Sequence, residues 1–318
     1  MHKLILFLLL VSLFGKAQSQ PLYADTTALC FASDTQAPMW IETLFLKKNN
    51  NKEATQKLFE AICQRKPGAL FIMGDVVNLG YSNRQWKPMD AYLQKLRNQN
   101  IAVYATLGNH EVMGQAKKGM RKFQERFPEH VPTGYVQVKD SIAVVLLNSN
   151  FGKLSAEEDA RQISWYKETL QKLDADSSIH FIISGCHHSP FTNSKVVGAS
   201  REVQEKFVPS FMASKKSRLF ISGHSHNYEH FQKEGKEFFV IGGGGGLHQY
   251  VKTGEGTFSD LACDYKPQFH YLTVKRNGDR LLVNSIQLKK DFSCFEDGRQ
   301  LVISKENMPA TDMANATQ

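Results

Sequence analysis

Five short polar clusters in this sequence combine side chains that bind divalent metal ions. In chain order they are Asp34-Thr35-Gln36, Gly74-Asp75, Gly108-Asn109-His110-Glu111, Gly185-Cys186-His187-His188-Ser189-Pro190 and Gly223-His224-Ser225-His226. Together they supply carboxylate, amide and imidazole groups, and no thiolate is needed. Such a mixture suits Mn, Fe, Zn or similar ions. Each cluster alone has an ordinary explanation, because a single Asp at a strand end is often only a turn residue.

The clusters follow segments that the sequence predicts to be buried strands. Apolar runs end just before them: "TTALCFAS", "GALFIMG", "IAVYATLG", "SIHFIISG" and "SRLFISG". Strands without polar alternation are buried on both faces, as in sheets covered by helices. Ligands of open α/β sheets bind beyond the carboxyl ends of the strands. We therefore expect the five clusters to converge at one edge.

Helices alternate with these strands. Amphipathic patterns predict helices over 51–66, over 85–100 with a start blurred by Pro88, and over 155–173. Ser155 and Glu158 form a capping-box pattern at the third start. Residues 135–140 and 141–149 predict two further strands that could pair. Residues 228–246 predict a hairpin that turns at Gly235, and 269–288 predict another around Asn277-Gly278.

The overall pattern predicts one α/β domain in which two sheets pack as a sandwich with helices outside. Residues 1–19 have the layout of a signal peptide, with Lys3 before an apolar core and small residues at Ala17 and Ser19. We therefore expect export, to a periplasm or to the medium, with cleavage before Gln20. The domain then spans 20–304, and 305–318 form a flexible tail. No apolar run is long enough to span a membrane.

The chain carries a formal charge of +8, and Lys3 and Lys16 in the predicted signal contribute two of these charges. A basic surface favours anionic partners such as phosphate esters or nucleic acid, although the cations are scattered. Of the five cysteines, Cys30 and Cys63 lie in apolar patterns and are expected to be buried. Cys263 and Cys294 lie in loop-like stretches and could form a disulfide in an exported protein.

The ordered set of clusters resembles the calcineurin-like metallophosphoesterase superfamily. Its signature runs D-x-H, G-D, G-N-H-[DE], H-x-P and G-H-x-H, and the match here spans Asp34 to His226. "HSPFTNS" and "GHSHNYEH" are also similar to the purple acid phosphatase branch. The resemblance implies a four-layer αββα fold and hydrolysis of phosphate esters by a hydroxide that bridges two metal ions. The run "VIGGGGG" is interpreted as structural.

The resemblance also implies a role for each matched residue. Asp75 should bridge the two ions, Asp34 and His226 should hold the first, and Asn109, His188 and His224 the second. His110 should stand near the leaving-group oxygen as a proton donor or a phosphate clamp. His188 fits H-x-P, which leaves His187 as an alternative ligand or as a second-layer or substrate contact.

Two positions depart from the pattern. Gln36 stands where the first motif has His, and it either touches no metal or acts as a weak amide ligand or water-positioning donor. Asn78 stands where the purple enzymes have a metal-binding Tyr, so a phenolate colour and a preference for ferric iron are not expected. The substrate side is open: Trp40, Tyr81, Trp86 and Tyr228 lie near the motif loops and could stack on a base or sugar, but core packing is favoured for each.

The sequence leads to three functional hypotheses. The first is an exported phosphatase, and the second is a phosphodiesterase acting on nucleotides or nucleic acid. The third is a metal-binding protein without activity, whose first site is weakened by Gln36. The sequence does not fix the metals, the substrate or the oligomeric state.

Overall fold

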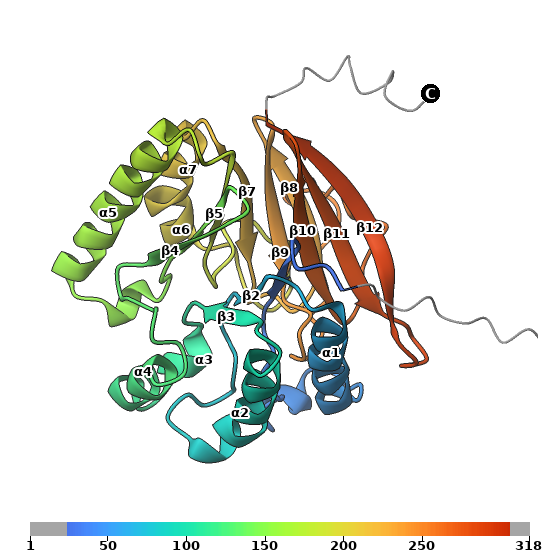
Figure 1. Cartoon of the computed structure of the whole chain (residues 1–318). Coiled ribbons are helices and arrows are strands. Elements are labelled where there is room, and N and C mark those ends of the chain that lie inside the picture. Colours follow the sequence, from blue (N-terminus) through green and yellow to red (C-terminus); the bar gives the residue numbers. More distant parts are fainter. Residues whose placement is uncertain (1–23, 306–318) are drawn as a thin grey trace, which may run out of the picture.

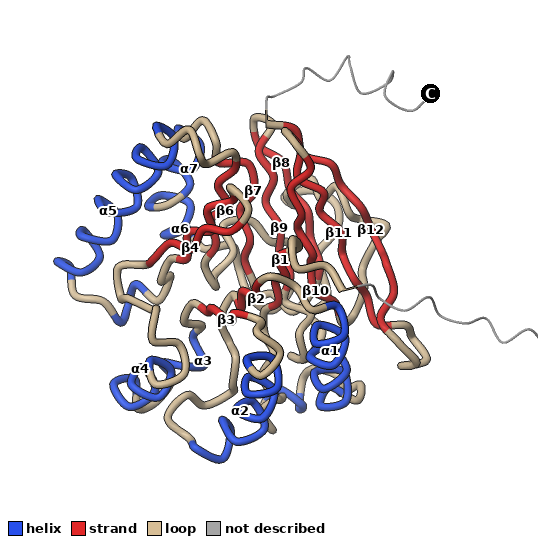
Figure 2. Tube along the Cα trace, in the orientation of Figure 1, coloured by secondary structure: helices blue, strands red, loops and turns tan. Residues whose placement is uncertain are grey.

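The protein folds into two six-stranded sheets that pack face to face, as seen in the computed structural model, which describes residues 24–305. The predicted signal peptide and, apart from Lys305, the predicted tail lie outside the described residues. Helices cover the outer face of each sheet (Figures 1 and 2). The predicted two-sheet sandwich flanked by helices is thereby confirmed.

The first sheet has the strand order β12-β11-β10-β1-β2-β3. Its central strands β1, β2 and β3 are parallel, and β10 joins β1 antiparallel and continues into an antiparallel meander. The bounds are β1 Leu29–Ala32, β2 Ala69–Ile72, β3 Ala102–Ala105, β10 His270–Asn277, β11 Arg280–Leu288 and β12 Phe295–Ser304.

The second sheet has the strand order β4-β5-β6-β7-β9-β8. Strands β5, β6, β7 and β9 are parallel, and β4 and β8 close the two edges antiparallel. The bounds are β4 Tyr135–Lys139, β5 Ile142–Leu146, β6 Phe181–Gly185, β7 Ser217–Ser222, β8 Tyr228–Lys233 and β9 Lys236–Ile241. The predicted pairing of the strands at 135–140 and 141–149 is confirmed by β4 and β5.

Three apolar cores hold the four layers together. The middle core lies between the sheets and includes Phe31, Phe71, Ile183 and Ile221. The outer cores lie between the first sheet and its helices and between the second sheet and its helices. The helices are α1 Asn51–Arg65, α2 Asn83–Arg97, α3 Asn109–Val112, α4 Ala116–Gln124, α5 Ala156–Ala175, α6 Arg201–Lys206 and α7 Val208–Ala213, with short 3-10 turns η1 Glu42–Leu44 and η2 Phe151–Lys153.

Several local expectations need correction. Helix α2 begins at Asn83, so Pro88 lies inside it and does not mark its start. In the β10–β11 hairpin Asn277 pairs with Arg280, so the two loop residues are Gly278 and Asp279. The long edge strand β12 was not predicted, because its charged residues obscure the alternation. The capping box of Ser155 and Glu158 is confirmed at the start of α5.

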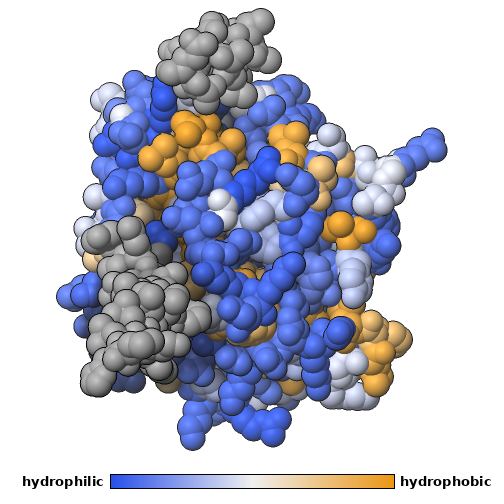
Figure 3. Space-filling model, turned by 90° about the vertical axis from the view of Figure 1, so that its right-hand side faces the viewer, coloured by the Kyte–Doolittle hydropathy of each residue, from blue (hydrophilic) through white to orange (hydrophobic). Residues whose placement is uncertain are grey.

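The cysteines are all free in the described structure, so the possible Cys263–Cys294 disulfide is not present. Cys30 and Cys63 are buried as predicted. Trp86 and Tyr228 pack in the core, but Trp40 is 74% exposed, which makes the core prediction wrong for that residue. None of the helices among residues 24–305 is long and apolar enough to span a membrane. The face formed on the β11–β12 side is mostly hydrophilic, with apolar groups that are separate from one another (Figure 3).

Candidate metal centre

The carboxyl ends of β1, β2, β3, β6 and β7 bring polar residues from five separate loops together. Asp34, Asp75 and His224 each adopt a left-handed backbone conformation, with φ of 57°, 50° and 66°. This conformation is uncommon for residues other than glycine. Backbone hydrogen bonds connect the loops after β1 and β2. The backbone N–H of Asp34 donates to the Gly74 carbonyl, and the backbone N–H of Gln36 donates to the Asp75 carbonyl. The predicted convergence is therefore observed.

A first group consists of Asp34, Asp75 and His226, whose ligand atoms all lie within 4.8 Å of one another. The three side chains are buried. His226 Nε2 lies 3.3 Å from Asp34 Oδ1 and also 3.3 Å from the Gln36 side-chain nitrogen. The other amide atom, Gln36 Oε1, is buried without a hydrogen-bond partner. Because the two ends of an amide are assigned by their contacts, the flipped amide would turn this oxygen toward His226.

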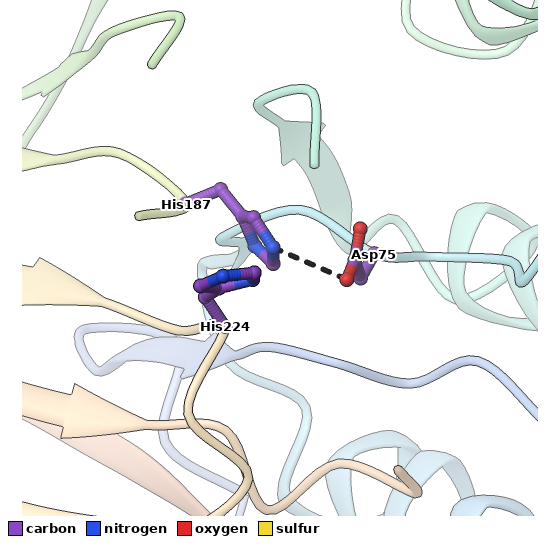
Figure 4. A group of neighbouring side chains, drawn as sticks. All are labelled: Asp75, His187 and His224. Atoms are coloured by element: carbon purple, nitrogen blue, oxygen red, sulfur yellow. Dashed lines mark ion pairs between the residues drawn. The ribbon is translucent and has the colours of Figure 1, made fainter. Parts of the chain in front are cut away.

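A second group consists of Asp75, His187 and His224, so Asp75 belongs to both groups. Figure 4 shows His187 and His224 reaching from two loops toward the Asp75 carboxylate. His187 Nε2 lies 3.1 Å from Asp75 Oδ2 and 3.0 Å from Asn109 Oδ1. Asn109, the first residue of α3, therefore joins this group through its amide oxygen.

The geometry of the two buried histidines calls for a cation beside each. His187 Nδ1 faces the Met73 carbonyl at 2.9 Å and His226 Nδ1 faces the Leu247 carbonyl at 2.8 Å. A carbonyl accepts, so each Nδ1 carries the hydrogen and the neutral ring presents an Nε2 lone pair to a carboxylate. Two lone pairs at 3.1–3.3 Å repel unless a proton or a metal ion lies near them. This backbone-oriented arrangement is typical of metal-binding histidines.

The pKa values of the group indicate the same need for positive charge beside Asp75. Burial alone would raise the pKa of Asp75, but the His187 and His110 rings hold that pKa well below its usual range. Burial opposes protonation of His187, yet the Asp75 carboxylate raises its pKa to about 9. Burial and the neighbouring His187 lower the pKa of His188 to about 3, and burial with the adjacent histidines lowers that of His224 well below normal.

The structure places His187, and not His188, beside Asp75 and Asn109. The Nδ1 atom of His188 faces the Ser149 hydroxyl at 2.8 Å, and its ring lies 4.5 Å from the His224 ring between centroids. The H-x-P spacing had favoured His188 as the ligand. The first histidine after β6, His187, is the one that lies in the second group with Asp75 and His224, while His188 contacts Ser149.

His110 lies at the floor of the cleft, next to Asp75. Its Nδ1 faces the Asn78 carbonyl at 3.0 Å, and its Nε2 lies 3.8 Å from Asp75 Oδ2. Its backbone amide donates to Asp75 Oδ1 at 2.9 Å. The ring is thus oriented by a backbone carbonyl that follows the Asp75 loop, and its remaining nitrogen stays available on the cleft side.

Glu111 is a positioning residue that the sequence reasoning did not single out. Its fully buried carboxylate accepts from the backbone N–H groups of Asp75, Val77 and Gly108 at 2.9, 3.0 and 2.8 Å. It thereby connects the loop after β2 with the loop after β3. Burial and the Asp75 charge raise the pKa of Glu111 to about 7. In the sequence, the acidic residue at the fourth position of Gly-Asn-His-Glu is the feature that could have identified Glu111.

Glycines allow the loops to approach closely. Gly74 has a φ of +86°, and a Cβ there would lie 2.8 Å from His187 Nδ1. In the glycine run after β9, a Cβ at Gly246 would lie 2.5 Å from His226 Nδ1, while the Gly246 amide donates to the Asp34 carbonyl. These contacts give the run a packing role behind the first group.

A cleft of about 380 Å³ opens directly above the two groups. Its floor includes Asp75, Asn109, His110, His224 and His226. Its walls come from residues 41–46 and 196–197 together with Gln249. A volume of this size lies in the range of small-molecule sites.

A family model described as calcineurin-like phosphoesterase matches residues 28–228. The comparison with curated proteins found no match. Among solved structures, the purple acid phosphatase PPD1 of yellow lupin (Lupinus luteus) is similar, with a TM-score of 0.65 and 14% identity over 89% of this chain and 55% of that chain. The chain thus spans little more than half the length of the lupin protein.

Two further solved structures share the fold. GAP50, the anchor in the inner membrane complex of Plasmodium, has a TM-score of 0.63 and 14% identity over 87% of this chain and 88% of that chain. A dimetal phosphatase from Danio rerio has a TM-score of 0.55 and 12% identity over 90% of this chain and all of that chain. At these identities the likeness establishes the fold alone.

Proposed function

The chain belongs to the calcineurin-like phosphoesterase family, and we propose that it is an exported phosphatase that hydrolyses phosphate monoesters at a centre of two metal ions. The family supports a hydrolase of phosphoric ester bonds. The observation that carries the proposal is Asp75, whose buried carboxylate belongs to both candidate ligand groups. A shared carboxylate is what a pair of ions a few ångströms apart requires.

The residues fit such a pair of ions. We assign Asp34, Asp75 and His226 to the first ion, with the Gln36 amide oxygen as an additional weak donor. Asp75, Asn109, His187 and His224 would hold the second, so we propose His187 and not His188 as its ligand. Bound ions of the Mn, Fe or Zn class would activate a water molecule and offset the charge of the phosphoryl oxygens.

His110 is assigned to the leaving group. In hydrolysis the water oxygen forms a bond to phosphorus, the ester P–O bond breaks, and the leaving oxygen takes up a proton to give an alcohol and inorganic phosphate. His110 presents Nε2 to the cleft while its Nδ1 is fixed by the Asn78 carbonyl. A protonated ring in this place donates its Nε2 hydrogen to the leaving oxygen.

The test uses an aryl phosphate and three variants. Asp75→Asn should abolish hydrolysis and lower the bound metal toward zero. His110→Ala should retain two ions and lower kcat by about 10²–10⁴-fold. The matched control is His180→Ala, because this histidine has 34% side-chain exposure and lies 3.7 Å from Asp279, outside the site. Full activity of Asp75→Asn, with circular dichroism showing an intact fold, would overturn the proposal.

Export is supported by the residue pattern of 1–19 alone. Mass spectrometry of the protein recovered outside the cytoplasm should show an N-terminus at Gln20. Recovery of the uncleaved chain from the cytoplasm would contradict it.

The same assays distinguish two alternative functions from the proposed phosphatase. A phosphodiesterase would hydrolyse a bis-aryl phosphate faster than the monoester, and the basic composition is the observation in its favour. A non-catalytic metal-binding protein would carry about one ion per chain and turn over neither ester. Gln36 in the first group is the observation that favours the latter.

A further inference from the structure

The cleft above the metal centre is polar on its floor and apolar on its walls. One wall consists of Ile41, Phe45 and Leu46, and the facing wall of Val196 and Val197. Several of these side chains are largely open to solvent, with exposed fractions of 46% for Ile41, 83% for Phe45 and 53% for Val196. Exposed apolar residues that rim a polar site indicate a surface that a ligand covers.

The charges of the cleft restrict what the ligand can carry. Among the residues that line it in the described structure there is no Lys or Arg. Apart from Asp75 at the floor, the charged lining residue is Glu42, which is acidic. A second phosphate group on the substrate would meet a carboxylate and no cation. This lining disfavours nucleoside polyphosphates and nucleic acid despite the basic composition of the chain.

The wall of Val196 and Val197 is held rigidly to the metal centre. The Ser194 hydroxyl accepts from both valine amides, at 3.0 and 3.2 Å, and donates to the Gln249 side chain at 2.7 Å. The backbone N–H of Gln249 donates in turn to the His226 carbonyl at 3.1 Å. The position of this wall is thereby coupled to a candidate ligand of the first ion.

The opposite wall is a single short turn with local bonding. The Glu42 carboxylate accepts from the Met39 amide at 2.6 Å, Thr43 donates to the Trp40 carbonyl, and Phe45 donates back to the Glu42 carbonyl. None of the three residues of η1 is buried. Trp40 and Leu44, on the same turn, are 74% and 65% exposed. Such a turn can adjust to the side of a ligand that the rigid wall fixes.

We infer that the substrate is a monoester of a single phosphate group with an apolar alcohol, an alkyl chain or one aromatic ring, which lies between these two walls. The inference rests on the proposed hydrolysis and specifies its substrate class. The phosphate lies on the metal centre, and the leaving oxygen lies beside His110. The apolar part then covers Phe45, Ile41 and Val196.

The experiment measures phosphate release from methyl, butyl and octyl phosphate and from a nucleoside monophosphate. A fully buried methylene raises kcat/KM about fourfold, equivalent to about 0.8 kcal/mol, and a half-buried one about twofold. We expect octyl phosphate to exceed methyl phosphate in kcat/KM by about 10–100-fold. The variants Phe45→Ser and Val196→Ser should each lower this ratio about tenfold.

Val302→Ser is the matched control, because Val302 is 51% exposed on β12 and lies outside the residues that line the cleft. It should leave the octyl-to-methyl ratio unchanged. Equal kcat/KM for methyl and octyl phosphate, or a preference for the nucleotide, would overturn the inference while leaving the phosphatase intact.

Calorimetric titration of octylphosphonate and methylphosphonate, which are not hydrolysed, separates the two proposals. If no ester is turned over but octylphosphonate binds at least tenfold more tightly, the hydrolysis fails and the apolar site stands. Equal binding of both phosphonates counts against the apolar site whatever the turnover.

Discussion

Replacing Glu111 tests whether one buried carboxylate holds the loops of the metal centre together. It accepts three backbone N–H bonds, and a buried donor left without an acceptor costs about 1–3 kcal/mol. Glu111→Ala orphans all three donors and should lower the free energy of unfolding by about 3–9 kcal/mol. That is a large part of the roughly 5–15 kcal/mol of a typical domain.

Glu111→Gln provides the graded comparison. The amide oxygen can take the place of Oε2 and keep the bonds from Asp75 and Gly108, while the NH₂ group then faces the Val77 amide. One bond is lost, so the expected decrease is about 1–3 kcal/mol. The neutral amide also avoids burying a charge beside Asp75, which offsets part of this loss.

Urea unfolding of the metal-free proteins, followed by circular dichroism, measures both decreases. Removing metal first is necessary, because a ligand that binds only the folded state adds its own stabilisation. Equal stability of the two variants, or a loss below about 0.5 kcal/mol for Glu111→Ala, would refute the assignment of Glu111 as a three-bond acceptor.

Three further perturbations address single positions. Elemental analysis should find about one ion in His187→Ala and two in His188→Ala, and the reverse result would restore His188 as the ligand. Gln36→His should tighten zinc binding at the first site about tenfold or more in a chelator competition, and unchanged affinity would place residue 36 away from the ion. Burial lowers the pKa of His130 to about 4, so the unfolded chain binds the proton more readily, and stability falls as pH drops from 6.5 to 4. His130→Phe should remove up to about 3 kcal/mol of this dependence between urea midpoints at pH 7 and pH 4, and an unaltered slope would contradict it.

The fold could be predicted from sequence because its central strands are short apolar runs followed by turns of small and polar residues. β1, β2, β6 and β7 are buried along their whole length, so their sequences lack any alternation that would confuse them with surface strands. β12 escaped prediction for the opposite reason. It is an edge strand in which most positions are partly or fully exposed, and its pairing with β11 includes a register shift between Asn284 and Ile286 that no local sequence pattern indicates.

The convergence of the motif loops was predictable, but the orientation of their side chains was not. A strand end fixes the region that a residue occupies, while the first turn after the strand decides which side chain points inward. The pair His187-His188 illustrates this, because both follow β6 and only the first reaches Asp75. The exposure of Trp40 is a related case. Its aromatic ring suggested burial, whereas the turn that contains it lies on the rim of a cleft.

The orientation of the Gln36 amide decides which of its two ends meets the first candidate ligand group. Gln36, which stands where the first motif has His, is only 1% exposed, so its amide is not a solvated surface group. With its nitrogen toward His226, the oxygen has no partner, and with its oxygen toward His226 the amide offers the first ion a neutral donor. A buried orphan oxygen is costly, and binding an ion would remove that cost. We therefore expect Gln36 to retune the first site toward oxygen donors without dismantling it, and the zinc competition with Gln36→His tests this.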